Sequence, residues 1–239
     1  MNYLDQTFPT PAENLACDEA LLLWREQADG AEILRVWEPR EHFVVLGRGN
    51  KAATEINLPA CRERGVPILR RCSGGGAVLQ GPGCLNYSLV LRIANHPALA
   101  SITQTNCFIM RRNAEAISSL LSREVAVAGF TDLALENFKF SGNAQRRKRE
   151  WLLFHGTFLL GLDVQVMQEL LLPPSKQPEY RQNRPHAKFL RQLDLPPEKI
   201  NAALRAAWGA NEVLAEIPSP LIAQLAKEKY SREDWNLRI

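Results

Sequence analysis

Hydrophobic residues recur along this 239-residue chain at two different spacings, which predict helices and strands. A capping box over residues 10–13, with proline at the first helical position, predicts a helix that ends before Gly30. A second long helix is predicted over residues 103–122, where apolar side chains recur every three or four positions. Its expected core-facing stripe is Cys107, Met110, Ala114, Ile117 and Leu121. Further helices are expected near residues 163–171, 197–208 and 219–230.

Period-2 alternation predicts the strands. Over residues 85–93, Tyr87, Leu89 and Leu91 alternate with Asn86, Ser88 and Val90. Other expected strands cover residues 32–39, 42–49, 66–71, 125–129, 132–137, 138–142 and 149–162, with a turn at Asn137. Strands precede, interrupt and follow the helices without a βαβ rhythm. The order therefore predicts an α+β fold with a mostly antiparallel, mixed sheet flanked by helices.

Composition narrows the class of protein. The 29 basic and 26 acidic residues leave a net charge of +3, too small to indicate general nucleic-acid binding. The five cysteines are odd in number and contain no CxxC pair, which favours reduced thiols in a cytoplasm. No apolar stretch resembles a signal core or reaches the length of a membrane span. We expect a cytoplasmic protein without membrane or nucleic-acid partners, although the basic run at 145–149 is compatible with a solvated patch or a docking surface.

The glycine-rich stretch 70–88, RRCSGGGAVLQGPGCLNYS, is the first candidate site. Consecutive glycines let backbone N–H groups surround an anion, and the fork of Arg70 or Arg71 suits phosphate or carboxylate. The stretch is neither a Walker loop nor a Rossmann fingerprint, because no GK[ST] follows and the next element is a strand. From spacing alone, a glycine-rich hairpin with surface arginines explains it equally well.

A second stretch, FKFSGNAQRRKREWLLFHGT, strengthens the anion-site hypothesis. Alternation predicts Lys139 and Ser141 on one face of a strand, and an inward-facing lysine is costly unless it meets an anion. On the next predicted strand, His155 and Thr157 share a face. His155 either reaches the same cavity or is a hydrogen-bonded core residue.

These two stretches together resemble the lipoate–protein ligases, within the biotin/lipoyl ligase and octanoyltransferase superfamily. Four further segments agree, in order: residues 14–22, 43–50, 131–137 and 178–190. The likeness covers nearly the whole chain. It implies a catalytic domain over residues 1–239 with the α+β fold of that superfamily.

The resemblance implies two chemical steps. Lipoate is activated by ATP, with Mg²⁺, to lipoyl-adenylate, and a lysine of a lipoyl carrier domain then takes the acyl group. Lys139 would be the catalytic residue, contacting the phosphate and the acyl oxygen. The implied adenylate and acyl contacts are Arg70, Ser73, Gly74, Gly75, Gly76, Ala77, Asp132, Ser141, Gly142, Asn143, His155, Gly156 and Thr157. Asp132 is also the candidate Mg²⁺ ligand. Trp37, Val44 and Val78 either line an acyl tunnel or pack in the core.

Two other functions stay open. Octanoyltransferases of the superfamily place a cysteine near the lysine, whereas no cysteine follows Cys107, and we interpret Cys72 and Cys84 as incidental. A non-catalytic lipoyl-adenylate binding protein is the other alternative, against which Lys139 argues.

The chain also departs from the family pattern. It has Gln80 and Gly81 where many ligases have histidine and aspartate. The small accessory domain that follows in long-form ligases is not expected here, so a separate accessory subunit is a possible partner. In the 178–190 segment, Arg181, Arg184 and His186 either close the site or cap a helix.

Overall fold

The computed structural model describes residues 1–238 and contains a mixed eight-stranded sheet with the order β11-β1-β2-β6-β10-β9-β8-β7. In this order the strands are Glu212–Val213, Asn2–Asp5, Ile33–Trp37, Cys84–Arg92, Trp151–Leu159, Phe138–Arg147, Asp132–Leu135 and Ala126–Ala128. Within this sheet β1 pairs in parallel with β2 and β11, and the other described pairings are antiparallel. A smaller sheet contains β4 (Ile68–Arg70), β3 (Phe43–Leu46) and β5 (Val78–Gln80). The predicted α+β fold is confirmed.

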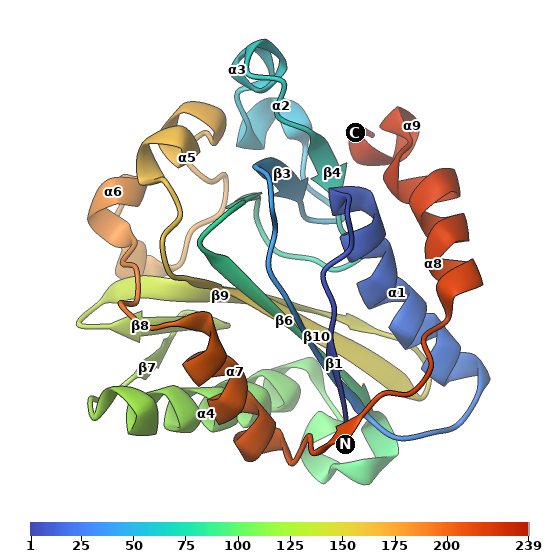
Figure 1. The fold of residues 1–239 in the computed structure, drawn as a ribbon. Helices are drawn as coiled ribbons and strands as arrows, with labels where there is room; N and C mark the ends of the chain where they lie inside the picture. Colours follow the sequence, from blue (N-terminus) through green and yellow to red (C-terminus); the bar gives the residue numbers. More distant parts are fainter. Residues whose placement is uncertain (239) are drawn as a thin grey trace.

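Helices cover both faces of the large sheet (Figure 1). On one face lie α4 (Ile102–Leu121) and α7 (Pro197–Trp208), and on the other α1 (Pro11–Gln27) and α8 (Ser219–Leu225). A π-helical turn, Ala226–Tyr230, continues α8, and α9 (Glu233–Asn236) follows. None of the helices within residues 1–238 is both long enough and apolar enough to span a bilayer.

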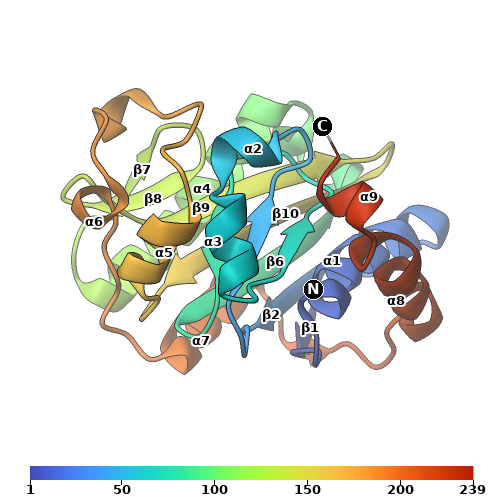
Figure 2. The same cartoon turned by 90° about the horizontal axis from the view of Figure 1, so that it is seen from above.

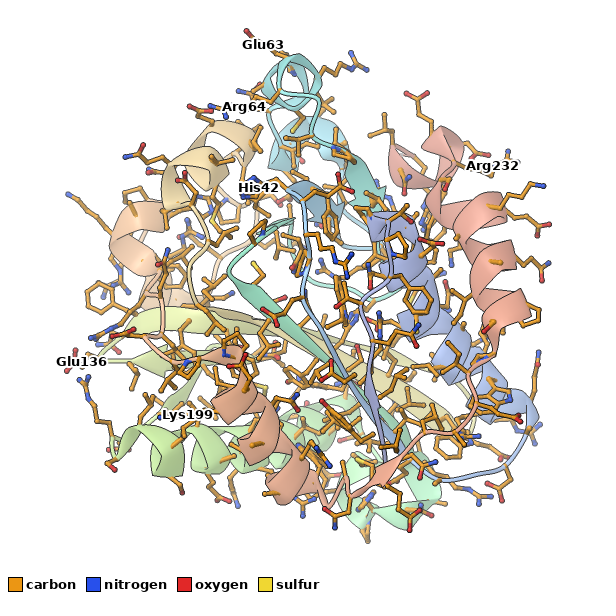
Figure 3. All side chains as sticks on the ribbon, viewed as in Figure 1. His42, Glu63, Arg64, Glu136, Lys199 and Arg232 are labelled. Atoms are coloured by element: carbon orange, nitrogen blue, oxygen red, sulfur yellow. The ribbon has the colours of Figure 1, made fainter. Side chains whose placement is uncertain are left out.

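Short helices surround the small sheet. They are α2 (Ala52–Glu55), α3 (Leu58–Glu63) and α5 (Val164–Leu170), and Figure 2 shows α5 beside α3. The short helix α6 (His186–Phe189) packs against α5 and β9. Single 3-10 turns occur at Ile93–Asn95, Pro97–Leu99 and Glu179–Arg181. A separate apolar cluster, including Leu46, Cys61 and Leu170, packs α2, α3 and α5 against the small sheet. Charged side chains at the periphery, such as Glu63, Glu136 and Arg232, point away from the body of the molecule (Figure 3).

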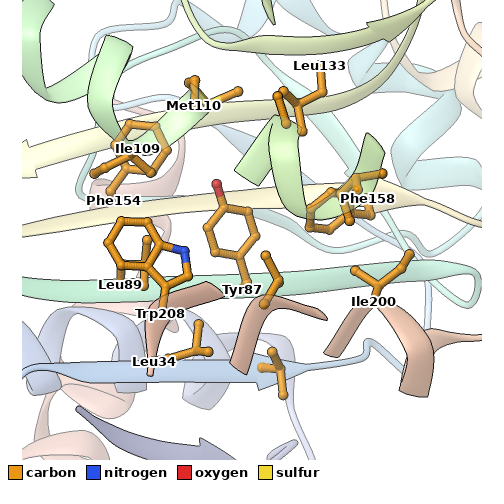
Figure 4. Packing of buried hydrophobic residues seen from close by; sticks show 14 of the residues in the cluster. Leu34, Tyr87, Leu89, Ile109, Met110, Leu133, Phe154, Phe158, Ile200 and Trp208 are labelled. Atoms are coloured by element: carbon orange, nitrogen blue, oxygen red, sulfur yellow. The ribbon is translucent and has the colours of Figure 1, made fainter. Parts of the chain in front are cut away.

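The sequence pattern explains the two faces of β6. Tyr87, Leu89 and Leu91 pack under α4 and α7, whereas Val90 packs towards α1, as the alternation predicted. Figure 4 shows Tyr87 and Leu89 among the residues of the first cluster. The capping box of α1 is confirmed, because Thr10 accepts from Glu13 N and Glu13 accepts from Thr10 N.

One feature of the predicted stripe on α4 was wrong. Met110, Ala114 and Ile117 are buried, but Cys107 is exposed and Ile109 takes a core position. Asn113 also faces the core, where its amide accepts from Trp208 Nε1 and donates to the hydroxyl of Tyr87, both at 2.8 Å. A polar residue with both amide groups paired can occupy a core position that a purely apolar pattern would not assign to it.

Candidate active site

A row of paired residues on neighbouring strands forms the floor of a cavity of about 800 Å³. Directly paired residues of neighbouring strands share one face of a sheet. Trp37 pairs with Asn86, Asn86 with Thr157, Thr157 with Gly142, and Gly142 with Asp132. These five residues therefore form a row across β2, β6, β10, β9 and β8, and all five line the cavity.

The glycine run lies over this floor. Gly75 would place a Cβ 3.6 Å from that of Ala144 on β9, and Ser73 Oγ lies 2.6 Å from His155 Nε2 on β10. Gly74, Gly75, Gly76 and Ala77 all line the cavity. Gly75 has a φ of +88°, a conformation that an L side chain rarely adopts.

Arg71 determines which backbone groups of the run are free. Its guanidinium donates to the carbonyl oxygen of Gly74 at 2.6 Å and to that of Gly76 at 2.8 Å. Burial lowers the pKa of Arg71 to about 10, so the group stays charged at neutral pH. Within residues 1–238, no acceptor is found for the N–H groups of Gly74, Gly75 and Gly76. Such amides, with their carbonyls held on the other side, form an anion-binding concavity.

Lys139 lies at the other end of the floor. Its Nζ is 2.8 Å from Asp132 Oδ1, and Asp132 Oδ2 accepts from the Tyr180 hydroxyl at 2.8 Å. Gly142 leaves room for this position of Lys139, because a Cβ there would lie 2.8 Å from Nζ and the lysine side chain would have to shift. The ammonium therefore rests directly over the backbone of β9.

A β-bulge separates Lys139 from Ser141. Lys139 pairs with Ala134 and Ser141 with Leu133, so one extra residue, Phe140, interrupts the ladder. Ser141 consequently pairs with Phe158 and faces the α4 side. The prediction that Lys139 and Ser141 share a face was wrong, because period-2 alternation does not hold across a bulge.

His155 joins the glycine run to α1. Its Nδ1 lies 3.0 Å from Asp18 Oδ2, and Asp18 Oδ1 lies 2.6 Å from Arg35 Nη1. Burial opposes ionisation of Asp18, but the Arg35 charge and the His155 hydrogen bond outweigh it and lower the pKa. His155 thus lines the cavity and is also hydrogen-bonded on both ring nitrogens. The two alternatives given for it, a cavity residue or a hydrogen-bonded residue, therefore both hold.

Gln80, one of the departures from the family pattern, closes a ring of three hydrogen bonds. Gln80 Nε2 donates to Thr157 Oγ1 at 2.7 Å, Thr157 donates to Asn86 Oδ1 at 2.5 Å, and Asn86 Nδ2 donates to Gln80 Oε1 at 2.9 Å. The ring fixes the orientation of three polar side chains in the cavity wall.

Gly156 gives room to Asn143. A Cβ at Gly156 would lie 1.6 Å from Asn143 Oδ1, which accepts from the Tyr87 hydroxyl at 2.6 Å. Asn143 Nδ2 also donates to the carbonyl of Thr131 at 2.7 Å. The side chain of Asn143 therefore ties β9 to Thr131, the residue that directly precedes Asp132.

Comparison with known proteins gives the same family along most of the chain. Residues 10–199 match the model for the lipoyl protein ligase A/B catalytic domain. The chain belongs to this family. It is 27% identical over 274 residues to the octanoyltransferase LipM of Geobacillus kaustophilus, covering 99% of this chain and 97% of that protein. It is 30% identical to a putative lipoate-protein ligase A of Aeropyrum pernix, over 89% of this chain and 76% of that protein.

Solved structures show the same fold. A lipoate-protein ligase A bound with ATP has a TM-score of 0.84 and 22% identity, covering 99% of this chain and 98% of that one. The ligase of a bipartite system from Thermoplasma acidophilum, described with its E2 lipoyl domain, also has a TM-score of 0.84 and 22% identity, over 99% and 95% of the two chains. The chain is thus an enzyme of the lipoyl protein ligase A/B family, which includes ligases and octanoyltransferases.

The structure of this lipoyl protein ligase A/B domain corrects the prediction for Arg70. Arg70 is fully buried outside the cavity. Its guanidinium donates to the carbonyl oxygens of Gly47, Arg48, Asn50, Trp235, Asn236 and Arg238. Consecutive strand residues point to opposite sides, so Arg71 reaches the glycine run whereas Arg70 holds the α9 segment.

Several other predicted positions lie just behind the wall. Ser73 and Ser141 are buried and do not line the cavity, although Ser73 contacts His155. Val44 packs in the core, and its neighbour Val45 lines the cavity with Trp37 and Val78. Ala77, Gly142, Asn143, Gly156 and Thr157 line the cavity as expected, while their roles in binding stay predictions.

The sequence reasoning missed part of the wall. Lys51, Phe130, Lys176 and Pro178 line the cavity and were not expected there. Arg181 and His186 of the 178–190 segment also line it, as the site-closing alternative expected. Arg184 lies outside, where it donates to the carbonyls of Asn137 and Tyr180. Burial, Arg181 and Lys139 lower the pKa of His186 to about 4. Local sequence does not specify which wall of a cavity such a segment covers.

The described residues offer neither a nucleophilic thiol nor a metal site at the cavity. Within residues 1–238, no cysteine lines it, and burial raises the pKa of both Cys72 and Cys84 to about 12. No cluster of three or more His, Cys, Asp or Glu suited to a metal ion occurs in the same residues. Asp132 Oδ1 is paired with Lys139 Nζ and Oδ2 with the Tyr180 hydroxyl, and the role of Asp132 towards Mg²⁺ or the adenylate stays a prediction.

Proposed function

We propose that this protein is an ATP-dependent lipoate–protein ligase. The observation that carries the proposal is Lys139, an ammonium at the floor of a cavity whose opposite wall has free backbone amides and in which no thiol is found among residues 1–238. This combination suits chemistry on a phosphate and an acyl oxygen without a cysteine acyl-enzyme.

Adenylation is the first step. A lipoate carboxylate oxygen attacks the α-phosphorus of ATP, an acyl–phosphate bond forms, and pyrophosphate leaves. Besides Lys139, the cavity wall carries Lys51, Lys176 and Arg181, which would offset the phosphate charge. Mg²⁺ would arrive with ATP as part of the substrate, since these walls suit phosphate rather than a metal ion. The ATP-bound ligase of the same fold supports this step.

The row of paired residues suggests how the acyl-adenylate lies. The phosphate would sit near Lys139 and Gly142, under the glycine run. The acyl arm would then pass Thr157 and Asn86 towards Trp37. Leu15, Val45 and Val78 line the cavity as well, and burying an aliphatic chain against them contributes roughly 25 cal/mol per Å².

Transfer is the second step. The neutral ε-amine of a carrier lysine attacks the acyl carbonyl, an amide forms, and AMP leaves. Lys139 would stabilise the negative charge that develops on the carbonyl oxygen. The bipartite ligase described with its E2 lipoyl domain supports a lipoyl domain as acceptor, and it favours a separate accessory subunit for full adenylation by this chain.

Octanoyl transfer without ATP is the second candidate, because relatives over nearly the whole chain are octanoyltransferases. Such a reaction needs an acyl acceptor on the enzyme or direct transfer between carriers. The lack of a thiol in the cavity wall of residues 1–238 argues against the acyl-enzyme form.

One set of assays separates the candidates. The purified protein is incubated with an apo lipoyl domain and with lipoate plus ATP, synthetic lipoyl-adenylate, or an octanoyl-loaded carrier, and products are weighed by mass spectrometry. We expect lipoylation from the adenylate, and from lipoate only when ATP is present. Modification from the octanoyl carrier alone, without lipoylation from the adenylate, would overturn the proposal. Brisk ligation from lipoate and ATP by this chain alone would show that no accessory subunit is needed.

A further inference from the structure

Asp132 has one partner on each carboxylate oxygen. Lys139 Nζ lies 2.8 Å from Oδ1, and the hydroxyl of Tyr180 donates to Oδ2 at 2.8 Å. Turning the carboxylate to present both oxygens to one ammonium would break the Tyr180 hydrogen bond. The Tyr180 contact therefore favours pairing of Lys139 with a single oxygen.

Tyr180 is itself firmly placed. The centroid of its ring lies 5.1 Å from that of Phe189. The guanidinium of Arg184 donates to two carbonyl oxygens, that of Tyr180 at 2.9 Å and that of Asn137 at 3.0 Å. Asn137 belongs to the turn between β8 and β9, the hairpin that carries Asp132 and Lys139. Tyr180 is thus anchored to the same hairpin as the two residues that it influences.

The hydroxyl of Tyr180 is a donor at every physiological pH. Burial and the neighbouring Asp132 carboxylate raise the pKa of the phenol, so the proton stays on oxygen. Tyr180 does not line the cavity, whereas Asp132 and Lys139 do. An effect of its hydroxyl on substrate would therefore pass through Asp132, to which that hydroxyl donates.

We propose that Tyr180 is a positioning residue: by holding Asp132 Oδ2 it aims the Lys139 ammonium over Gly142, where the reacting phosphate and acyl oxygen would lie. Without this hydrogen bond the Asp132 carboxylate turns and takes the ammonium with both oxygens. The Lys139 ammonium then stabilises negative charge on the substrate less well, in both adenylation and transfer. This role rests on the proposed ligase function, because it concerns the same lysine.

The test is Tyr180→Phe, which keeps the ring against Phe189 and removes only the hydroxyl. The matched control is Tyr3→Phe, because Tyr3 also donates to an aspartate, Asp5 Oδ2 at 3.0 Å, and does not line the cavity. Lipoyl-adenylate synthesis and transfer from synthetic lipoyl-adenylate are measured separately. We expect kcat to fall roughly tenfold in both reactions for Tyr180→Phe, the effect typical of a hydrogen bond to a charged group, with KM for lipoate nearly unchanged. Tyr3→Phe should stay within about twofold of the wild type in both reactions.

A double-mutant cycle distinguishes positioning from a general structural effect. If Tyr180 acts through Asp132, then Tyr180→Phe adds nothing to the loss caused by Asp132→Asn. Additive losses, or a Tyr180→Phe enzyme with wild-type kcat, would refute the role. A wild-type enzyme that neither forms nor uses lipoyl-adenylate would refute the ligase function instead, so the two failures are distinguishable.

Discussion

The guanidinium of Arg71 holds the carbonyl oxygen of Gly74 at 2.6 Å, from within the strand-to-loop junction that opens the glycine run. The same guanidinium nitrogen donates to Gly76 at 2.8 Å, so one planar group sets the direction of two peptide units. The anion-binding role that we propose for the run thus depends on a side chain that is itself buried behind it.

Replacing Arg71 with lysine tests this dependence. Lysine lacks the Nε donor that Arg71 also directs to Gly74, and its shorter side chain does not carry the ammonium to the position of Nη2. Each hydrogen bond lost contributes about 0.5–1.5 kcal/mol. We expect the free energy of unfolding in urea to fall by about that amount and the KM for ATP to rise. Arg111→Lys, at an exposed position on α4, is the control. Unchanged KM and stability in Arg71→Lys would contradict the role of the fork.

Lys139→Ala removes the proposed charge-stabilising group. We expect transfer from lipoyl-adenylate to fall by about 10²–10³-fold, as for other lost donors to a developing negative charge. Stability should change by less than ~1 kcal/mol, because the pair with Asp132 is partly exposed. Lys148→Ala, exposed just beyond the end of β9, should leave both quantities unchanged. Wild-type transfer by a folded Lys139→Ala enzyme would remove Lys139 from the mechanism.

Alanine substitutions at two glycines of the site should affect different quantities, stability at Gly156 and substrate binding at Gly76. A Cβ at Gly156 would meet Asn143 Oδ1 at 1.6 Å, so Gly156→Ala should destabilise the fold by about 1–3 kcal/mol. Gly76 has no atom within 4 Å of its Cβ position, so Gly76→Ala should keep the melting temperature and raise the KM for substrates, because the methyl group enters the cavity. Thermal melts and steady-state kinetics on both variants check the pair. Equal melting temperatures would contradict the close contact at Gly156.

Thiol alkylation of the native enzyme separates adenylate chemistry from a cysteine acyl-enzyme. Cys107 is the exposed cysteine, while Cys17, Cys61, Cys72 and Cys84 are buried. Iodoacetamide reacts with accessible thiolates, so at neutral pH it should label Cys107 first. This labelling should leave ligation unchanged. Inactivation in step with labelling of Cys72 or Cys84 would favour the transferase. Peptide mass spectrometry identifies the labelled residue.

His186 makes a pH dependence of stability testable. Its pKa is lowered to about 4 by burial and by the charges of Arg181 and Lys139, against an ordinary value near 6.5 in the unfolded chain. Between these values the unfolded state binds more protons than the folded state, so stability from this group falls as the pH drops from about 6.5 to 4. Urea unfolding of wild type and His186→Gln across this range should show a shallower slope for the variant. Parallel slopes would show that His186 titrates normally.

The sign is the same for Asp18, at lower pH. Arg35 and His155 lower its pKa in the folded state, so its contribution is complete above the ordinary carboxyl value near 4 and is lost as the pH falls through the lowered value. This loss lies below the pH range of the His186 effect, and the two can be separated in one titration.

Local sequence predicted the helices and most strands well. The α1 capping box, the turn at Asn137 and the alternation in β6 depend on neighbours a few residues apart, and all three are present. The two stretches around Gly74–Gly76 and Lys139 were also found from composition, because glycine runs and an inward lysine are unusual in themselves. By resemblance, those stretches identified the family.

Tertiary structure decided which side chains face the cavity. Arg70 and Arg71 are adjacent and chemically alike, and only the docking of α9 against β4 assigns one to the framework and the other to the glycine run. A bulge at Phe140 moved Ser141 to the other face, which alternation along one strand does not reveal. Asp18 meets His155 across 137 residues of chain, and Tyr180 meets Asp132 across 48. Such contacts depend on how separate elements pack, because hydrogen bonding and burial are set by the final positions of both partners and not by the sequence around either one.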